Sequence, residues 1–161
     1  REDFRPFAPA ILREDLTEWF DLKDESPYMM FTDFVASEKK LEEKENKNEE
    51  LKGLNKLSIK RSSIPAVTHI DYSARIQTVD SDRNPFFFLL LSEFKKRTNC
   101  PILINTSFNV RGEPIVCSPA DAIKCFFGTN IDILLIENFI VRKRDQNPNF
   151  SKSYIDNIVP D

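Results

Sequence analysis

The sequence has few of the residues that bind metals through nitrogen or sulfur. Its 161 residues include three cysteines and one histidine, His69. Cys100, Cys117 and Cys125 form no C-x-x-C pair, whereas a zinc site needs about four well-spaced ligands that usually come in pairs. We therefore predict no metal site built from this chain. An odd number of free thiols, at least two of them in apolar surroundings, is typical of a reducing compartment and predicts a cytoplasmic protein.

Long apolar runs and an excess of charge of one sign are also missing. No run approaches the ~20 apolar residues that a membrane-spanning helix needs, which predicts a soluble protein. The 23 basic and 26 acidic residues give a net charge of −3, so no basic field favours general affinity for nucleic acid. Residues Arg1-Glu2-Asp3 are neither a methionine start nor an apolar leader. We expect this start to be a cut inside a longer protein, and the chain to form one domain.

The most informative stretch follows a short apolar run, Ile102–Ile104, which has the branched residues of a buried strand. Polar side chains begin where this run stops; they are Asn105, Thr106, Ser107, Asn109 and Arg111. Open α/β sheets bind ligands beyond the carboxyl ends of their strands, an Arg fork matches two oxyanion oxygens, and Gly112 permits a turn closed to other residues. The stretch predicts a loop that binds phosphate or carboxylate. The alternative is a polar loop held by its own Asx and Ser/Thr turns.

The rest of the chain alternates strand-like and helix-like segments. Strands are predicted over residues 28–31, 67–70, 74–79, 131–136 and 139–142, and helices over residues 13–20, 86–98 and 122–127. Asn84 and Pro85 cap the middle helix, which is expected to bury Phe86, Leu89, Leu90 and Phe94. This order predicts a mixed α/β (α+β) domain with a twisted sheet and helices packed against it.

Residues 36–63 differ in composition from their surroundings, because lysine and glutamate replace almost all apolar residues. Such a segment buries too little surface to offset the cost of ordering it. We predict a mobile loop or a solvated helix that is an insertion in the domain. Beyond Lys143 the polar tail, residues 144–161, is expected to be loosely held.

Three segments, in this order, resemble one enzyme family. They are Arg1-Glu-Asp-Phe-Arg-Pro-Phe-Ala-Pro; Ile64-Pro-Ala-Val-Thr-His-Ile-Asp-Tyr-Ser-Ala-Arg-Ile-Gln-Thr-Val; and Asn105-Thr-Ser-Phe-Asn-Val-Arg-Gly-Glu-Pro-Ile-Val, followed by Ser118-Pro-Ala-Asp-Ala and Cys125-Phe. Together they resemble the C-terminal domain of the NodU/CmcH-type carbamoyltransferases, which modify nodulation factors, cephamycins and aminoglycosides. The resemblance covers residues 1–143.

The resemblance implies a YrdC-like fold that binds ATP, with Mg²⁺, and carbamoyl phosphate to make carbamoyl-adenylate. It also implies a sugar-kinase/actin-like N-terminal domain that holds a metal ion and passes the carbamoyl group to a hydroxyl of a small-molecule acceptor. The catalytic residues it suggests are Arg75, Ser107 and Arg111; the binding residues are Arg5, His69, Asn105, Thr106 and Asn109. On the residues alone, alternatives remain: a surface Arg5, a structural His69, and an ion pair of Arg75 with Asp71.

Two further considerations qualify this hypothesis. Tyr72 stands where many family members carry glycine, and family members have a basic residue upstream of the position of Arg1. The competing functions are a non-catalytic module that binds nucleotides or anions, or regulates, and an RNA-linked YrdC-type protein. The second needs a basic concave face, which the net charge of −3 does not favour.

Overall fold

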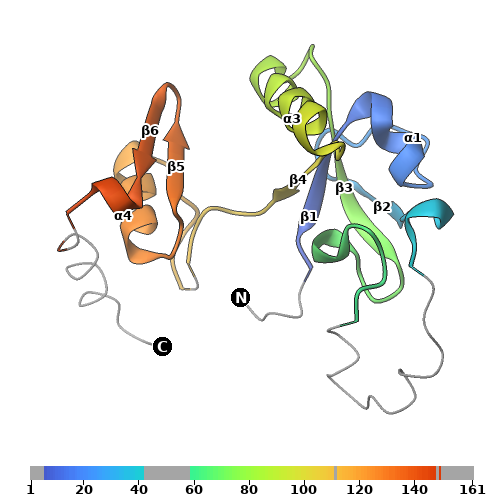
Figure 1. The fold of residues 1–161 in the computed structure, drawn as a ribbon, viewed down its shortest axis with the longest axis horizontal. Helices are drawn as coiled ribbons and strands as arrows, with labels where there is room; N and C mark the ends of the chain where they lie inside the picture. The colour runs from blue at the N-terminus through green and yellow to red at the C-terminus, as the bar shows by residue number, and fades with distance from the viewer. Residues whose placement is uncertain (1–5, 42–58, 111, 148, 150–161) are drawn as a thin grey trace. The chain divides into compact units, whose positions relative to one another are not determined.

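The computed structural model describes residues 6–41, 59–110, 112–147 and 149, and it divides the chain into two compact units, Arg1–Thr106 and Ser107–Asp161 (Figure 1). Both units combine helices with a β-sheet. The predicted mixed α/β fold is therefore confirmed. Its YrdC-like character and the single domain over residues 1–143 stay predictions.

The first unit is built on a four-stranded sheet with the order β2-β3-β1-β4. Its strands are β1 (Ala8–Leu12), β2 (Phe31–Phe34), β3 (Ser73–Val79) and β4 (Ile102–Asn105). The central pair, β1 and β3, is parallel, and β4 and β2 join it antiparallel from either side. A mixed sheet of this kind brings segments from the start, middle and end of the unit together.

Each face of this sheet packs against its own helix (Figure 1). On one face, Ile11, Ala74 and Ile76 form a core with residues of the 3₁₀ and α-helical segment η1 (Arg13–Asp15) and α1 (Leu16–Trp19), and with Phe20. On the other face, Ala10, Leu12 and Val79 pack with Leu91 of α3 (Pro85–Thr98). Strand residues alternate between the two cores because successive side chains point to opposite faces.

The bounds of α3 and its cap are confirmed, but its predicted buried face is wrong except for Phe94, which is half-buried. Asn84 caps the helix by accepting a hydrogen bond from the Phe87 backbone N–H at 3.3 Å. Leu91 is fully buried and Phe87 and Phe88 pack beside it, whereas the exposed fractions of Phe86, Leu89 and Leu90 are 85%, 59% and 50%. Residues 86–91 are all apolar, so no polar residue marks which side faces outward.

Two predicted strands are also corrected. Residues 65–67 form a 3₁₀ turn, η4, and a tight turn follows at His69–Tyr72, where a strand over 67–70 was predicted. Pro65 starts this turn, because its fixed φ suits a helical first position. Tyr28 and Met30 are exposed rather than buried, and strand β2 begins only at Phe31.

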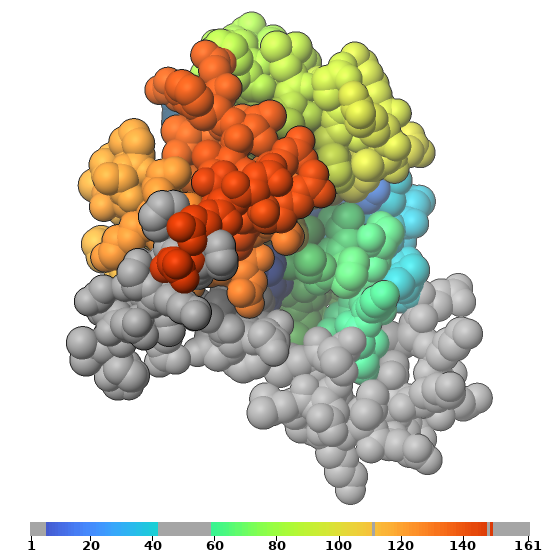
Figure 2. All heavy atoms as spheres, turned by 60° about the vertical axis from the view of Figure 1, so that its left-hand side comes forward, coloured from blue at the N-terminus to red at the C-terminus, as the bar shows by residue number. Residues whose placement is uncertain are grey.

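The ends of the predicted insertion belong to the folded unit. Val35 and Ala36 are buried, and η2 (Ser37–Lys39) leads to Lys40, which pairs with Ser62 in an antiparallel bridge. The Leu41 N–H donates to the Arg61 carbonyl at 2.8 Å, and the two stretches, cyan and green, lie side by side in Figure 2. The lysine- and glutamate-rich centre, residues 42–58, lies outside the described residues.

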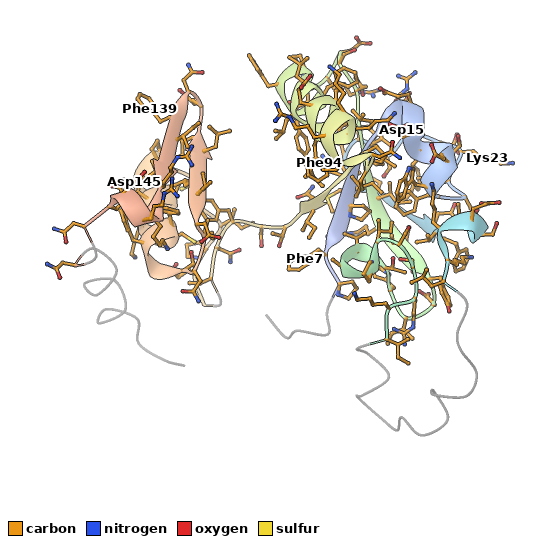
Figure 3. All side chains as sticks on the ribbon, viewed as in Figure 1. Phe7, Asp15, Lys23, Phe94, Phe139 and Asp145 are labelled. Carbon is orange, nitrogen blue, oxygen red and sulfur yellow. The ribbon has the colours of Figure 1, made fainter. Side chains whose placement is uncertain are left out.

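A partly buried ion pair joins α3 to the segment after β1. Lys95 donates to both carboxylate oxygens of Asp15, at 2.6 and 2.8 Å, and Asp15 lies on the side of the unit where α1 approaches α3 (Figure 3). The Asp15 side chain is 9% exposed and that of Lys95 is 39% exposed. The hydrogen bonds to Asp15 raise the pKa of Lys95. The pair joins residues that lie 80 positions apart in the sequence.

We expect Lys95→Met to lower the free energy of unfolding by about 1–3 kcal/mol, because it leaves the Asp15 carboxylate nearly buried without its cation. Chemical unfolding followed by the fluorescence of Trp19 measures this. Lys96→Met is the matched control, since the Lys96–Glu93 pair of the next residue is largely exposed and should contribute little. Equal stability of the Lys95→Met and Lys96→Met variants would contradict the assignment.

The second unit packs α4 (Pro119–Gly128) against a hairpin of β5 (Ile133–Ile136) and β6 (Phe139–Arg142). Its core consists of Ala122, Phe126 and Leu134. The predicted cap is confirmed, because Ser118 accepts a hydrogen bond from the Asp121 N–H at 3.2 Å. At the other end of α4, the Lys143 ammonium donates to the carbonyls of Phe126 and Thr129, where the helix dipole favours a cation.

Three observations bear on the predicted absences. Cys100, Cys117 and Cys125 are free thiols. No group of three or more His, Cys, Asp or Glu side chains within the described ranges is placed to hold a metal ion. None of the helices in that part of the chain has the length and apolarity to cross a membrane.

Candidate functional site

Four polar side chains share one face of the sheet in the first unit. Ser73, Arg75 and Gln77 occupy alternate positions of β3 and so point to one side. The register sets Ala10 of β1 opposite Gln77, and Ala8 opposite Asn105 of β4, which puts Asn105 on the same side. Helix α3 packs on Ala10, Leu12 and Val79. We call Ser73, Arg75, Gln77 and Asn105 the polar face.

Arg75 is the cation of the polar face. It is exposed on β3, opposite Thr32 of the neighbouring strand. The alternative of an ion pair with Asp71 is wrong, since the Asp71 carboxylate binds Ser73 instead. Among the described residues, Arg75 forms no ion pair. A guanidinium without a carboxylate partner has its whole fork available to an anionic ligand.

Asn105 is fixed by a chain of side-chain hydrogen bonds. Its Nδ2 donates to Gln77 Oε1 and lies 3.3 Å from Met29 Sδ, and Gln77 Nε2 donates to the Pro27 carbonyl at 3.3 Å. This chain ties the end of β4 to β3 and to the segment before β2. Asn105 therefore holds a fixed position against Gln77, two residues from Arg75 on the same face of β3, with its Oδ1 outside these bonds. Gln77 was missed by the sequence reasoning, although its polar position two residues after Arg75 on the same face was a usable signal.

His69 belongs to a second network at the start of β3. Its Nδ1 lies 2.9 Å from Ser73 Oγ, and that hydroxyl donates to Asp71 Oδ1 at 2.7 Å. The Ser73 backbone N–H also donates to Asp71 Oδ1, at 3.0 Å. These bonds from Ser73 lower the pKa of Asp71, so Asp71 is a carboxylate at neutral pH. The imidazole is thereby anchored next to the polar face.

Tyr72 closes the tight turn before β3 in a left-handed conformation. The Tyr72 N–H donates to the His69 carbonyl at 3.1 Å and the His69 N–H donates to the Ser73 carbonyl at 2.7 Å, so the chain makes a tight turn between them. In this turn Tyr72 has φ of 66°. A left-handed residue closing such a turn favours glycine, which has no Cβ. Tyr72, where the resemblance implies glycine in many members, therefore carries backbone strain.

We expect Tyr72→Gly to be more stable than Tyr72→Ala by about 1 kcal/mol, because both remove the ring but only glycine avoids the left-handed cost. Thermal or urea unfolding of the two variants measures the difference. Both variants lack the ring contacts of Tyr72, including that with the Lys40 ammonium, 5.6 Å from the ring centroid. The difference in stability between the two variants therefore does not contain those contacts. Equal stability of the Gly and Ala variants would show that the turn does not constrain this residue.

The other predicted site residues fall in different places. Thr106 is the last residue of the first unit and Ser107 begins the second; both are exposed. Asn109 uses its amide group within its own loop, donating to the carbonyls of Val110 and Glu113 at 3.2 and 2.9 Å. The turn expected at Gly112 is confirmed by its φ of 82°. Arg5 and Arg111 lie outside the described residues.

Lys40 is a cation that the sequence reasoning assigned to the insertion. Its ammonium lies 5.8 Å from the Phe34 ring centroid and 5.6 Å from that of Tyr72. Phe34 is the cross-strand partner of Ser73, and cross-strand partners lie on one face of a sheet. Lys40 therefore adds positive charge near the Ser73 end of the polar face. The sequence could not single out Lys40, because one lysine within a lysine-rich stretch has no distinguishing pattern.

Comparison with known proteins relates this site to a family. The family described as "Carbamoyltransferase C-terminus" matches residues 1–143. The chain is 50% identical over 146 residues to an uncharacterized protein of Synechocystis sp., which covers 91% of this chain and 24% of that protein. It is 42% identical over 144 residues to nodulation protein NolO of Bradyrhizobium diazoefficiens, covering 89% and 23%.

A relative with a named reaction also matches. The chain is 34% identical over 123 residues to the 3'-hydroxymethylcephem-O-carbamoyltransferase of Amycolatopsis lactamdurans, covering 76% of this chain and 19% of that protein. The chain thus spans about a quarter or less of the length of these relatives. Its polar face comes from residues 73–105, inside the range that the family matches. The chain belongs to the carbamoyltransferase C-terminus family.

Proposed function

We propose that this chain is the C-terminal part of an ATP-dependent O-carbamoyltransferase and that it binds carbamoyl phosphate and ATP to form carbamoyl-adenylate. The reaction joins the carbamoyl group to the AMP part of ATP, with one water consumed and phosphate and pyrophosphate released. The observation that carries the proposal is the Arg75 guanidinium, which has no carboxylate partner among the described residues. It lies on the polar face, within the residues that match the carbamoyltransferase family.

The residues suit electrostatic catalysis. Transfer of a phosphoryl or nucleotidyl group depends mainly on holding the reactants and stabilising negative charge. Arg75 supplies charge and two parallel donors for phosphate oxygens, and the fixed Asn105 orients a second group beside it. Thr106, at the end of the first unit, would add a hydroxyl donor. The roles that the resemblance implies for Arg5, Ser107, Asn109 and Arg111 stay predictions. No nucleophile paired with a base is needed, so no covalent enzyme intermediate is proposed.

Mg²⁺ would enter with ATP and bind its phosphate oxygens, where it neutralises charge. Such an ion keeps several waters and needs few protein ligands. A further metal ion belongs, in this proposal, to an N-terminal sugar-kinase/actin-like domain of the same polypeptide. That domain would transfer the carbamoyl group to the hydroxyl of a small molecule in the cytoplasm.

Calorimetric titration of the chain with carbamoyl phosphate and, separately, with ATP tests the proposal. We expect binding of both ligands, and carbamoyl phosphate-dependent pyrophosphate release from the full-length protein. Binding of nucleotide without any turnover in the full-length protein would favour the alternative of a non-catalytic or regulatory module. Absence of carbamoyl phosphate binding to both the chain and the full-length protein would refute the proposal.

A further inference from the structure

The hydrogen bonds around His69 determine which ring nitrogen carries its proton. Ser73 has one hydroxyl proton, and that proton is donated to Asp71 at 2.7 Å. The Ser73 oxygen can therefore only accept from His69 Nδ1, 2.9 Å away. Asp71 cannot return a proton, because an ionised carboxylate is an acceptor only. A neutral His69 in this network has a proton on Nδ1 and a lone pair on Nε2.

The position of His69 relates this lone pair to the proposed ligand. Ser73, which anchors the ring, is two residues before Arg75 on the same face of β3. His69 is half-buried and Ser73 is buried, so the ring is held by the fold and not free on the surface. The Nε2 lone pair cannot bind the phosphate held by Arg75, because Nε2 and the phosphate oxygens are all hydrogen-bond acceptors. It suits an N–H group elsewhere in the molecule that carries the phosphate.

We propose that His69 Nε2 accepts a hydrogen bond from the NH₂ of the carbamoyl group, and that Asp71 and Ser73 are positioning residues that keep it an acceptor. The inference rests on the proposed function, since it assumes carbamoyl phosphate as the ligand of Arg75. It makes His69 a specificity-determining residue. Acetyl phosphate has the same phosphate but a methyl group in place of the NH₂, so it cannot make this bond.

The proton position can be measured directly, because His69 is the one histidine in the chain. Nitrogen-15 labelling of histidine gives a single imidazole, whose two ring nitrogens differ in chemical shift when one is protonated. For the neutral ring we expect the Nδ1–H form. Ser73→Ala should move the signals toward the Nε2–H form that free histidine prefers, and Ser73→Thr should restore them. An Nε2–H form in the wild-type chain would overturn the inference.

Ligand discrimination in the full-length protein tests the second step. We expect His69→Phe to weaken carbamoyl phosphate binding about threefold to tenfold, the effect of one neutral hydrogen bond, with acetyl phosphate binding nearly unchanged. His69→Gln, which keeps an acceptor near the Nε2 position, should lose less. Equal weakening for both acyl phosphates, or a loss confined to ATP, would overturn the inference while the proposed function stands. A wild-type protein that binds no carbamoyl phosphate would refute both.

Discussion

Replacing Arg75 by alanine is expected to lower carbamoyl phosphate-dependent pyrophosphate release by the full-length protein at least about 100-fold. Removal of one preorganised group that stabilises charge in a transition state typically costs 10²–10³ in rate. Arg75 is the cation that the structure sets on the polar face without a carboxylate partner among the described residues. Arg75→Lys should recover part of the rate, since it restores the charge but not the two parallel donors. Pyrophosphate release is followed with a coupled assay.

The matched control is Arg97→Ala, which removes the same charge from an exposed position near the C-terminal end of α3. It should leave the rate near wild type. Trp19 fluorescence checks that both variants are folded. Trp19 lies in the core on the opposite face of the sheet from Arg75, so its fluorescence should stay unchanged. A normal rate in the Arg75→Ala variant would remove Arg75 from the catalytic set. Equal losses in both variants would assign the effect to overall charge.

Elements with a clear end signal could be predicted from the sequence. The starts of α3 and α4 follow from Asn84 and Ser118, each a cap followed by proline, and both caps accept the expected hydrogen bonds. Strand β6 matches its predicted range. The face of α3 could not be predicted, because six apolar residues in succession have no helical period. Which of them is buried depends on Ala10, Leu12 and Val79 across the packing interface.

The site was only partly predictable for a similar reason. Arg75 was found because it is a charged residue within a strand pattern, and Asn105 because it follows an apolar run. That they share one face depends on the sheet order, in which β1 lies between β3 and β4, and on the register of the strands. Sequence periodicity carries no information on that order. The bond between Asp71 and Ser73 was missed because a strand was predicted over residues 67–70, where the chain makes a tight turn at His69–Tyr72.

We expect Phe126→Ala to lower the free energy of unfolding of the second unit by about 3–5 kcal/mol, because it deletes a large, fully buried side chain and leaves a cavity. Phe126 is 0% exposed, and the Lys143 ammonium lies 4.6 Å from its ring centroid. Phe20→Ala is the matched change in the first unit, where Phe20 is 1% exposed. Native-state hydrogen exchange of the β5 and β6 amides reports the second unit, and Trp19 fluorescence reports the first. A loss below about 1 kcal/mol would contradict the core assignment.

The same pair of variants tests the number of domains. The chain has one tryptophan, and it packs with Phe20 in the core of the first unit. Two-state unfolding gives coincident transitions with all probes. If the chain unfolds as the single domain predicted from its length, Phe126→Ala therefore lowers the stability reported by Trp19 fluorescence as much as that reported by exchange of the β5 and β6 amides. If the two compact units unfold separately, the Trp19 transition keeps its wild-type midpoint in Phe126→Ala and moves only in Phe20→Ala.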